Sequence, residues 1–307
     1  MSDISLLGGI PLKGQDLAAS IVFAVAYCVL AGVCVWRLVS PATRCGLLVR
    51  PAIFIVARIG TFIIRAVMAD GHNDSTGLYI AEQILLLCGF VLLCDPLMQL
   101  AAYHISRHAA PSAQRGGHSP KIMVLLRLCL LTALILGIYA GSKMGSVIGS
   151  GADSGSTLST LKTCRDVNAI LCLVVTVSVG LTVAFWQVSG HGLPVRPALV
   201  IITGAVLLSV CSGYRIFIYE KSPAVSAISV STKSGFYCLS ALPEFLVTAI
   251  YVGFNVVELC DVREGVAKEK ESKAMRKAHM QGGAYHPEPA EASNDKYPPT
   301  YGGARHA

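Results

Sequence analysis

Seven long apolar runs, separated by polar links, dominate the chain. They cover approximately residues 17–37, 48–68, 78–103, 122–141, 168–188, 198–218 and 236–259. A helix needs about 20 apolar residues to cross the hydrocarbon of a bilayer, and each run reaches that length. Backbone polar groups in lipid must find partners within their own segment, so the runs are predicted to be helices. The expected fold is an all-α polytopic membrane protein with seven transmembrane helices.

The composition agrees with a chain that lies mostly in lipid. Of its 307 residues 53% are hydrophobic and 14% are charged, whereas soluble domains carry about 25% charged residues. The pattern divides the chain into a short extracytosolic N-terminus (1–16), a seven-helix bundle (17–260) and a tail (261–307). Residues 1–16 lack the basic region of a signal peptide, so the first helix is expected to be a permanent anchor. The eleven cysteines lie mostly in apolar runs, as small buried hydrophobes do, and we expect no metal and no cofactor.

The distribution of Lys and Arg near the helix ends predicts the orientation. Six of them flank one side of the predicted helices: Lys13, Lys143, Lys162, Arg165, Lys221 and Lys233. Thirteen flank the other: Arg37, Arg44, Arg50, Arg107, Arg115, Lys121, Arg196, Arg263, Lys268, Lys270, Lys273, Arg276 and Lys277. The richer side is expected in the cytosol, which places the N-terminus outside and the C-terminus inside. Asn73 opens a glycosylation sequon in the predicted outer link after the second helix; a chance sequon too near the membrane for modification is the alternative.

Charged residues inside the apolar runs are the candidate functional residues, because a charge within hydrocarbon costs at least about 2.5 kcal/mol on insertion scales. Arg58 and Arg65 lie seven residues apart in the second run, almost on one helical face. Glu82 and Gln83 open the third run at a depth comparable to Arg65. Because a short link joins these two runs, an Arg65–Glu82 pair is expected. Asp95, further along, is expected to make a hydrogen bond within the bundle.

The last two runs add Tyr214, Arg215 and Glu244. Glu244 follows Pro243, which frees a backbone carbonyl one turn earlier and so makes a polar notch. Counted by depth, most of these side chains converge in the outer half of the bundle. A salt-bridged structural clamp and a polar cavity for an amphipathic headgroup both fit this convergence. The predicted polar cluster comprises Arg58, Arg65, Glu82, Gln83, Asp95, Tyr214, Arg215 and Glu244.

The tail changes character along its length. Residues 261–281 carry mixed charges, and the Gly-, Pro-, Tyr- and His-rich remainder is predicted to be disordered. Pro298, Pro299 and Tyr301 form the P-P-x-Y pattern that WW domains bind as a polyproline II segment. A WW-domain ubiquitin ligase is the expected partner, with tail lysines as acceptors. Chance occurrence in a Pro-rich tail is the alternative.

Four motifs resemble those of the fungal RTA-like family, the lipid-translocating exporters. They are A-R-I-G-T-F-I-I-R in the second run, Y-I-A-E-Q-I-L-L-L in the third, G-Y-R closing the sixth and F-Y…A-L-P entering the seventh. The resemblance loosely covers residues 17–260. It implies seven helices with the N-terminus outside, movement of lipids such as sphingoid bases, and resistance to membrane-active toxins. Ile218 and Ser240 stand where the family tends to have acidic residues, and Glu244 replaces the second of these. The positions that match the family's polar and aromatic motif residues are Arg65, Gln83, Tyr214, Arg215, Phe236, Tyr237 and Pro243.

Other classes of membrane protein fit less well. A seven-helix receptor of unknown ligand is the alternative, although the third run ends in Q-L-A-A-Y-H instead of a D-R-Y-like triplet and the seventh lacks N-P-x-x-Y. A retinal protein needs a lysine in its last helix, and residues 236–262 contain none. An intramembrane zinc hydrolase needs histidines inside helices, and the eight histidines fall in links, helix ends or the tail. The expected protein is therefore not an enzyme; it acts on membrane lipids in the plasma membrane or an endomembrane and binds no nucleic acid.

The orientation is testable with a tag at the C-terminus. Sealed microsomes that contain the tagged chain should expose the tag to added protease, since the C-terminus is predicted in the cytosol. A matched tag at the N-terminus should be protected until detergent opens the vesicles. The reverse pattern would invert the topology.

Overall fold

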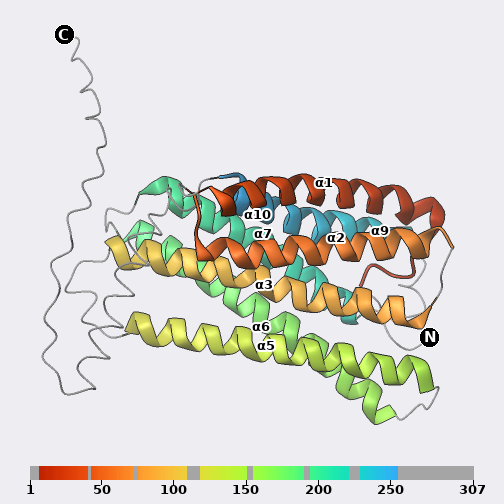
Figure 1. Ribbon diagram of the computed structural model, residues 1–307. Helices are drawn as coiled ribbons and strands as arrows, with labels where there is room; N and C mark the ends of the chain where they lie inside the picture. Colours follow the sequence, from red (N-terminus) through yellow and green to blue (C-terminus); the bar gives the residue numbers. More distant parts are fainter. Residues whose placement is uncertain are drawn as a thin grey trace, which may run out of the picture. The chain divides into compact units, whose positions relative to one another are not determined.

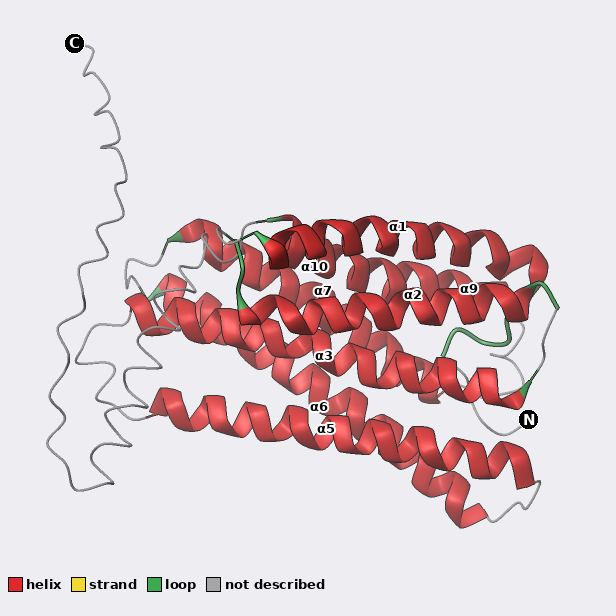
Figure 2. Cartoon of the chain, viewed as in Figure 1, coloured by secondary structure: helices red, strands yellow, loops and turns green. Residues whose placement is uncertain are grey.

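The computed structural model describes residues 7–40, 43–71, 75–108, 118–150, 155–189, 194–220 and 229–254, and these are all-α (Figure 2). Seven spans within them are long and apolar enough to cross a membrane, as the apolar runs predict, and α9, η2 and α10 together form the seventh. The elements are α1 (Lys13–Val39), the 3-10 turn η1 (Gly46–Leu48), α2 (Val49–Ala69), α3 (Thr76–His108), α5 (His118–Ser150), α6 (Gly155–Val188), α7 (Val195–Glu220), α9 (Val230–Phe236), the π-helical η2 (Tyr237–Ala241) and α10 (Leu242–Gly253).

Successive spans pack against one another, and the seventh returns to the first through the contact of α10 with α1. Helix α3 lies at the centre, because it contacts α2, α5, α6, α7 and α10; Figure 1 shows it between α2 and the α5–α6 pair. In its most apolar stretch 67% of residues are buried within the protein, against 17% for α1. Polar side chains on α3 can therefore meet partners from most of the other helices.

Two boundaries differ from those that the apolar runs predict. The apolar runs end at residue 141 and resume at residue 168, but α5 continues to Ser150 and α6 already begins at Gly155. Within this extension the hydroxyls of Thr160 and Thr163 donate to carbonyls four residues earlier, and so fit a helix without apolar contacts. The seventh span also starts six residues earlier than predicted, at Val230. The apolar runs mark the part of each helix that contacts lipid, whereas the helix itself can continue beyond that part.

Close approach of helices depends on small residues at the centre of the bundle. A side chain at Gly137 of α5 would meet the Asn168 amide of α6, and one at Gly141 would meet Ile84 of α3. Nδ2 of Asn168 donates to the carbonyl of Ala133 at 2.5 Å, which joins α6 to α5. Small residues and interhelical hydrogen bonds are what hold helices together in lipid, where apolar burial gives no driving force.

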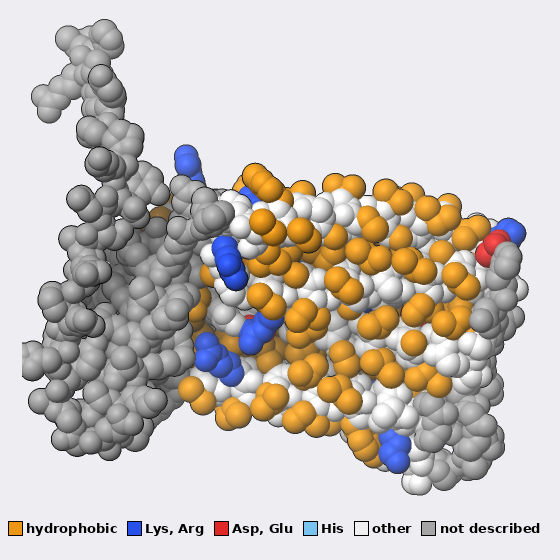
Figure 3. Space-filling view, viewed as in Figure 1, with side chains coloured by type: hydrophobic (Ala, Val, Ile, Leu, Met, Phe, Trp, Pro, Cys, Tyr) orange, Lys and Arg blue, Asp and Glu red, His pale blue; other side chains and the backbone are white. Residues whose placement is uncertain are grey.

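The outer surface of the bundle is apolar over its middle. Figure 3 shows hydrophobic side chains across the centre of the visible face, with most of the Lys and Arg side chains toward its two ends. The most exposed apolar side chains, among them Val188, Val39 and Phe185, are more than two thirds exposed. This surface suits contact with lipid tails, so the charged residues inside the bundle must be explained by contacts within the protein.

Replacing Gly141 with Ala should destabilise the bundle. The added Cβ would lie 2.4 Å from Cγ1 of Ile84, so α5 or Ile84 must shift, at an expected loss of about 1–3 kcal/mol. Thermal unfolding of the purified chain in detergent measures this loss. Gly32→Ala on α1 is the control, because its Cβ meets nothing within 4 Å. Equal unfolding temperatures for the two variants would contradict the packing of α5 on α3.

Candidate functional site

Helix α2 carries three arginines that each meet a carboxylate from another helix. Arg50, Arg58 and Arg65 follow at intervals of eight and seven residues, about 12 and 10 Å along the axis at 1.5 Å per residue. A guanidinium is not deprotonated in proteins, so each one inside a membrane-spanning bundle needs a counter-charge. The three arginines therefore define three levels of polar contacts.

The first level is the end cluster, Asp16, Arg65, Glu82, Lys233 and Tyr237, near the end of the bundle where α1 begins. Arg65 lies 2.8 Å from Asp16 (Nη2–Oδ1) and 2.6 Å from Glu82 (Nη1–Oε1). The Lys233 ammonium lies 2.5 Å from the second oxygen of Asp16. The Tyr237 hydroxyl lies 3.1 Å from both Oδ1 of Asp16 and Nε of Arg65. Two cations thus face two carboxylates, all four at most 2% exposed, and the cluster is formally neutral.

The segment before α1 covers this cluster. The carbonyl of Gly8 accepts a hydrogen bond from Nη2 of Arg65 at 2.5 Å, and that of Leu7 accepts one from Nε2 of Gln83 at 3.3 Å. Leu7 itself is fully buried. Gly8 has a φ of +82°, and a Cβ there would lie 2.9 Å from the Arg65 guanidinium. Only glycine fits this backbone over the charged group without strain.

The second level is the middle cluster, Arg58, Arg215, Ser240 and Glu244, drawn from α2, α7, η2 and α10. Glu244 lies 2.6 Å from Arg58 (Oε2–Nη2) and 2.9 Å from Arg215 (Oε1–Nη2). The Ser240 hydroxyl donates to the same carboxylate at 3.3 Å. Arg215 also donates to the carbonyl of Leu86 at 3.1 Å. Two guanidiniums share one carboxylate here, at exposures of 1% or less, so the cluster carries a formal charge of +1.

The third level lies toward the other end of α2. Arg50 pairs with Asp95 of α3, and Asp95 accepts a further hydrogen bond from Gln99, one turn away. The Arg50 side chain is 42% exposed. Exposed pairs of this kind contribute less than buried ones, because solvent and headgroups screen them.

The seventh span links the end and middle clusters. Lys233, Tyr237, Ser240 and Glu244 recur at intervals of four, three and four residues, which places them on one face of a helix. Between the first and last of them, η2 forms a π-helical turn in which the Leu242 N–H bonds to the Tyr237 carbonyl. Such turns are rare and frequently occur at functional sites. One face of this span therefore contacts both charged levels.

The structure contains the Arg65–Glu82 pair that the sequence predicts, and it also pairs Arg215 with Glu244. The prediction of one converging cluster is wrong, because Arg65 with Glu82 and Arg215 with Glu244 occupy separate levels and Asp95 lies in a third. The ends of the apolar runs, which set the predicted depths, do not coincide with the helix ends. The Tyr214 hydroxyl donates to the carbonyl of Thr232 at 2.9 Å and, among the described residues, makes no hydrogen bond to a charged side chain.

The sequence predictions do not include two charged residues of the end cluster. Asp16 lies in the first turn of α1 and not in the terminus, and its side chain accepts the Leu12 N–H at 3.0 Å. Residues 236–262 contain no lysine, but the seventh span begins at Val230 and so includes Lys233, which is ion-paired with Asp16. The spacing of Lys233 to Tyr237 and Glu244 on one helical face is the signal in the sequence for this residue.

Several predicted sites lie outside the described residues. They are the sequon at Asn73 and the WW-binding motif at Pro298, Pro299 and Tyr301.

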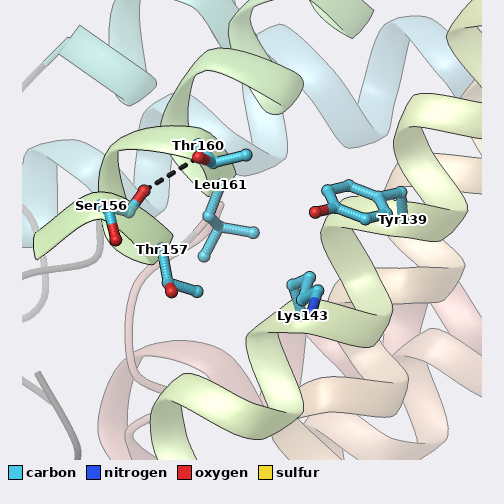
Figure 4. Close-up of a pocket in the computed structure, with 6 residues that line it drawn as sticks. All are labelled: Tyr139, Lys143, Ser156, Thr157, Thr160 and Leu161. Atoms are coloured by element: carbon cyan, nitrogen blue, oxygen red, sulfur yellow. Dashed lines mark hydrogen bonds between the residues drawn. The ribbon is translucent and has the colours of Figure 1, made fainter. Parts of the chain in front are cut away.

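A small pocket of about 120 Å³ lies between α5 and α6, apart from the charged clusters (Figure 4). Tyr139 and Lys143 of α5 face the turn of α6 that carries Ser156, Thr157 and Thr160, and the Thr160 hydroxyl donates to the Ser156 carbonyl. The Lys143 ammonium lies 5.9 Å from the centre of the Tyr139 ring. The pocket lies beside the N-terminal turns of α6, which begins at Gly155.

Seven apolar spans around a charged interior define the class: the chain is a polytopic, seven-helix membrane protein. Compared with known protein families, with curated proteins and with solved structures, the chain matches none of them. The likeness to lipid-translocating exporters therefore rests on the sequence motifs and on the number of spans.

Replacing Asp16 with Asn should strongly destabilise the protein. The change removes one of two carboxylates that face Arg65 and Lys233, and breaking a buried ion pair costs about 3–5 kcal/mol. Unfolding of the purified chain in detergent measures the loss. Lys13→Gln breaks the Lys13–Asp70 pair, in which the lysine is 70% exposed, and should cost at most about 1 kcal/mol. If both variants unfold alike, Asp16 is not the counter-charge of the end cluster.

Proposed function

We propose that this membrane protein moves or senses amphipathic lipids or toxins, and that its buried charged levels engage the headgroup. The observation that carries the proposal is the stacking of two ionic clusters, one above the other, along α2 and the seventh span. Arg65 and Arg58 are each at most 1% exposed and about 10 Å apart along the helix axis. Moving a charged headgroup from water into an apolar bundle is unfavourable. The buried charges of the two clusters can take the place of the water that the headgroup loses.

The cover over the end cluster suggests how a headgroup would enter. Leu7 and Gly8 occupy two hydrogen-bonding positions on Gln83 and Arg65 with their backbone carbonyls. A ligand with an acceptor group and an apolar tail offers the same combination that this segment presents. A headgroup that enters from the end predicted to face outside would replace the Gly8 carbonyl as a hydrogen-bond acceptor of Arg65. This replacement breaks and forms no covalent bond, in keeping with a non-enzymatic role.

The resemblance to lipid-translocating exporters supports the same proposal. The motifs that carry it include Arg65, Tyr237 and Arg215, and all three lie in or beside the charged levels. Membrane lipids are the proposed partners, in the plasma membrane or an endomembrane. A WW-domain ligase at the tail would regulate the amount of protein, independently of the interior.

A seven-helix receptor is the second candidate function. The observation that favours it is the complete pairing of charges in the end cluster, which ties α1, α2, α3 and α9 together. A ligand that displaced Leu7 and Gly8 would change these contacts and bias the bundle between two arrangements. A receptor should give an intracellular signal that depends on ligand and leave the lipid distribution unchanged.

Reversing one charge of the middle cluster should abolish lipid export. Arg215→Glu or Glu244→Arg leaves like charges in contact, and we expect export of a fluorescent lipid from cells to fall by at least about tenfold, the equivalent of 1.4 kcal/mol. The double exchange should restore export only in part, because it places an arginine at position 244 against Arg58. Lys13→Glu, on the exposed pair, is the control. Normal export by a reversed variant present at the wild-type level would refute the transport proposal.

A further inference from the structure

The middle cluster has one more positive charge than it has negative charges. Arg58 and Arg215 both contact Glu244, at 2.6 and 2.9 Å, and no other carboxylate contacts them among the described residues. Two guanidiniums and one carboxylate give the middle cluster a formal charge of +1.

Neighbouring groups do not cancel this charge. The thiol of Cys211 donates to the Ser240 carbonyl, and the phenol of Tyr27 lies near Glu244 and Arg58. Thiols and phenols in their ordinary state are uncharged at pH 7. Among the described residues, the buried carboxylates Asp16 and Glu82 belong to the end cluster, and Asp95 pairs with Arg50.

Several donors around the cluster have no hydrogen-bond partner among the described residues, although the guanidinium carbons of Arg215 and Arg58 lie 4.1 and 4.8 Å from the ring centres of Phe90 and Phe54. They include Nε and Nη1 of Arg215 and Nε of Arg58, all buried. The hydroxyl of Ser212 is likewise buried and unpartnered, and it lies three residues before Arg215, on the same side of α7. A buried donor without an acceptor costs free energy. The unpartnered groups are mainly donors, and an anion satisfies donors and surplus positive charge together.

We propose that the middle cluster binds one singly charged carboxylate, held by Arg58 and Arg215 beside Glu244. Guanidinium is suited to this anion, because its planar N–H groups match carboxylate oxygens and it is more weakly hydrated than an ammonium. Ser212 provides a neutral donor from α7. The carboxylate belongs either to a small free acid or to the headgroup of an amphiphile. Binding at this site adds the missing negative charge and leaves the cluster neutral, like the end cluster.

The middle cluster is also part of the proposed function, and binding of a carboxylate to it is an equilibrium property of the folded chain. Binding is measured on the purified chain without transport, and export is measured in cells. Each can therefore fail without the other.

The test is the unfolding temperature of the full-length chain, purified in non-ionic detergent, as acetate or dodecanoate is added. A ligand that binds only the folded state begins to raise this temperature near its Kd, and the rise then grows with the logarithm of the ligand concentration. A rise that begins at similar concentrations of both acids identifies a free acid as the source. A rise that begins at dodecanoate concentrations at least about 100-fold lower, equivalent to two factors of ten in affinity, identifies an amphiphile headgroup. No rise with either acid overturns the proposal.

Two variants separate this site from others, and they act in opposite directions. Glu244→Gln raises the surplus to two positive charges, so the acid concentration at which the rise begins should fall about tenfold. Arg58→Gln removes the surplus and should abolish the rise. Lys143→Gln, in the pocket between α5 and α6, should leave it unchanged. A rise that is lost in the Lys143 variant, or unchanged in the Glu244 variant, refutes binding at the middle cluster even if the Arg58 variant fails to fold.

Discussion

The pairing of the α2 arginines with carboxylates from other helices is the interaction on which the bundle depends. A guanidinium keeps its charge in the low dielectric of a membrane interior, whereas a lysine can become neutral by losing a proton and a carboxylate by gaining one. Each arginine of α2 must therefore be met by an acid, and the acids come from α1, α3 and α10. The positions of these helices around α2 are thus constrained by charge as well as by shape.

The end cluster and the middle cluster compensate their buried arginine charges in different ways. The end cluster balances two cations with two anions, and the backbone of Leu7 and Gly8 completes its hydrogen bonds. The middle cluster leaves a surplus charge and several unpartnered donors. A balanced, covered cluster is suited to stability, whereas a surplus at the middle of α2 is suited to binding. The π-helical turn of η2 lies between them and contributes Tyr237 to one and Ser240 to the other.

Small residues where helices meet allow the charged side chains to contact one another. A Cβ at Gly89 of α3 would lie 3.6 Å from the Phe54 ring and 3.7 Å from Nη1 of Arg58, so this glycine leaves room for the α2 side chains of the middle cluster. Without close approach, the charged side chains would have to extend through lipid to meet. Charge pairing and helix packing therefore depend on each other in this bundle.

The sequence by itself determined the seven spans, since their length and apolarity are set by the thickness of the bilayer. It also identified most of the buried charges, and the Arg65–Glu82 pair followed from two helices joined by a short link. It did not reveal that Asp16 contacts Lys233, 217 residues away, or that Glu244 is shared by Arg58 and Arg215. Those partners depend on the rotation and depth of each helix against its neighbours. Side-chain packing across the whole bundle fixes both, and no local pattern in the chain encodes them.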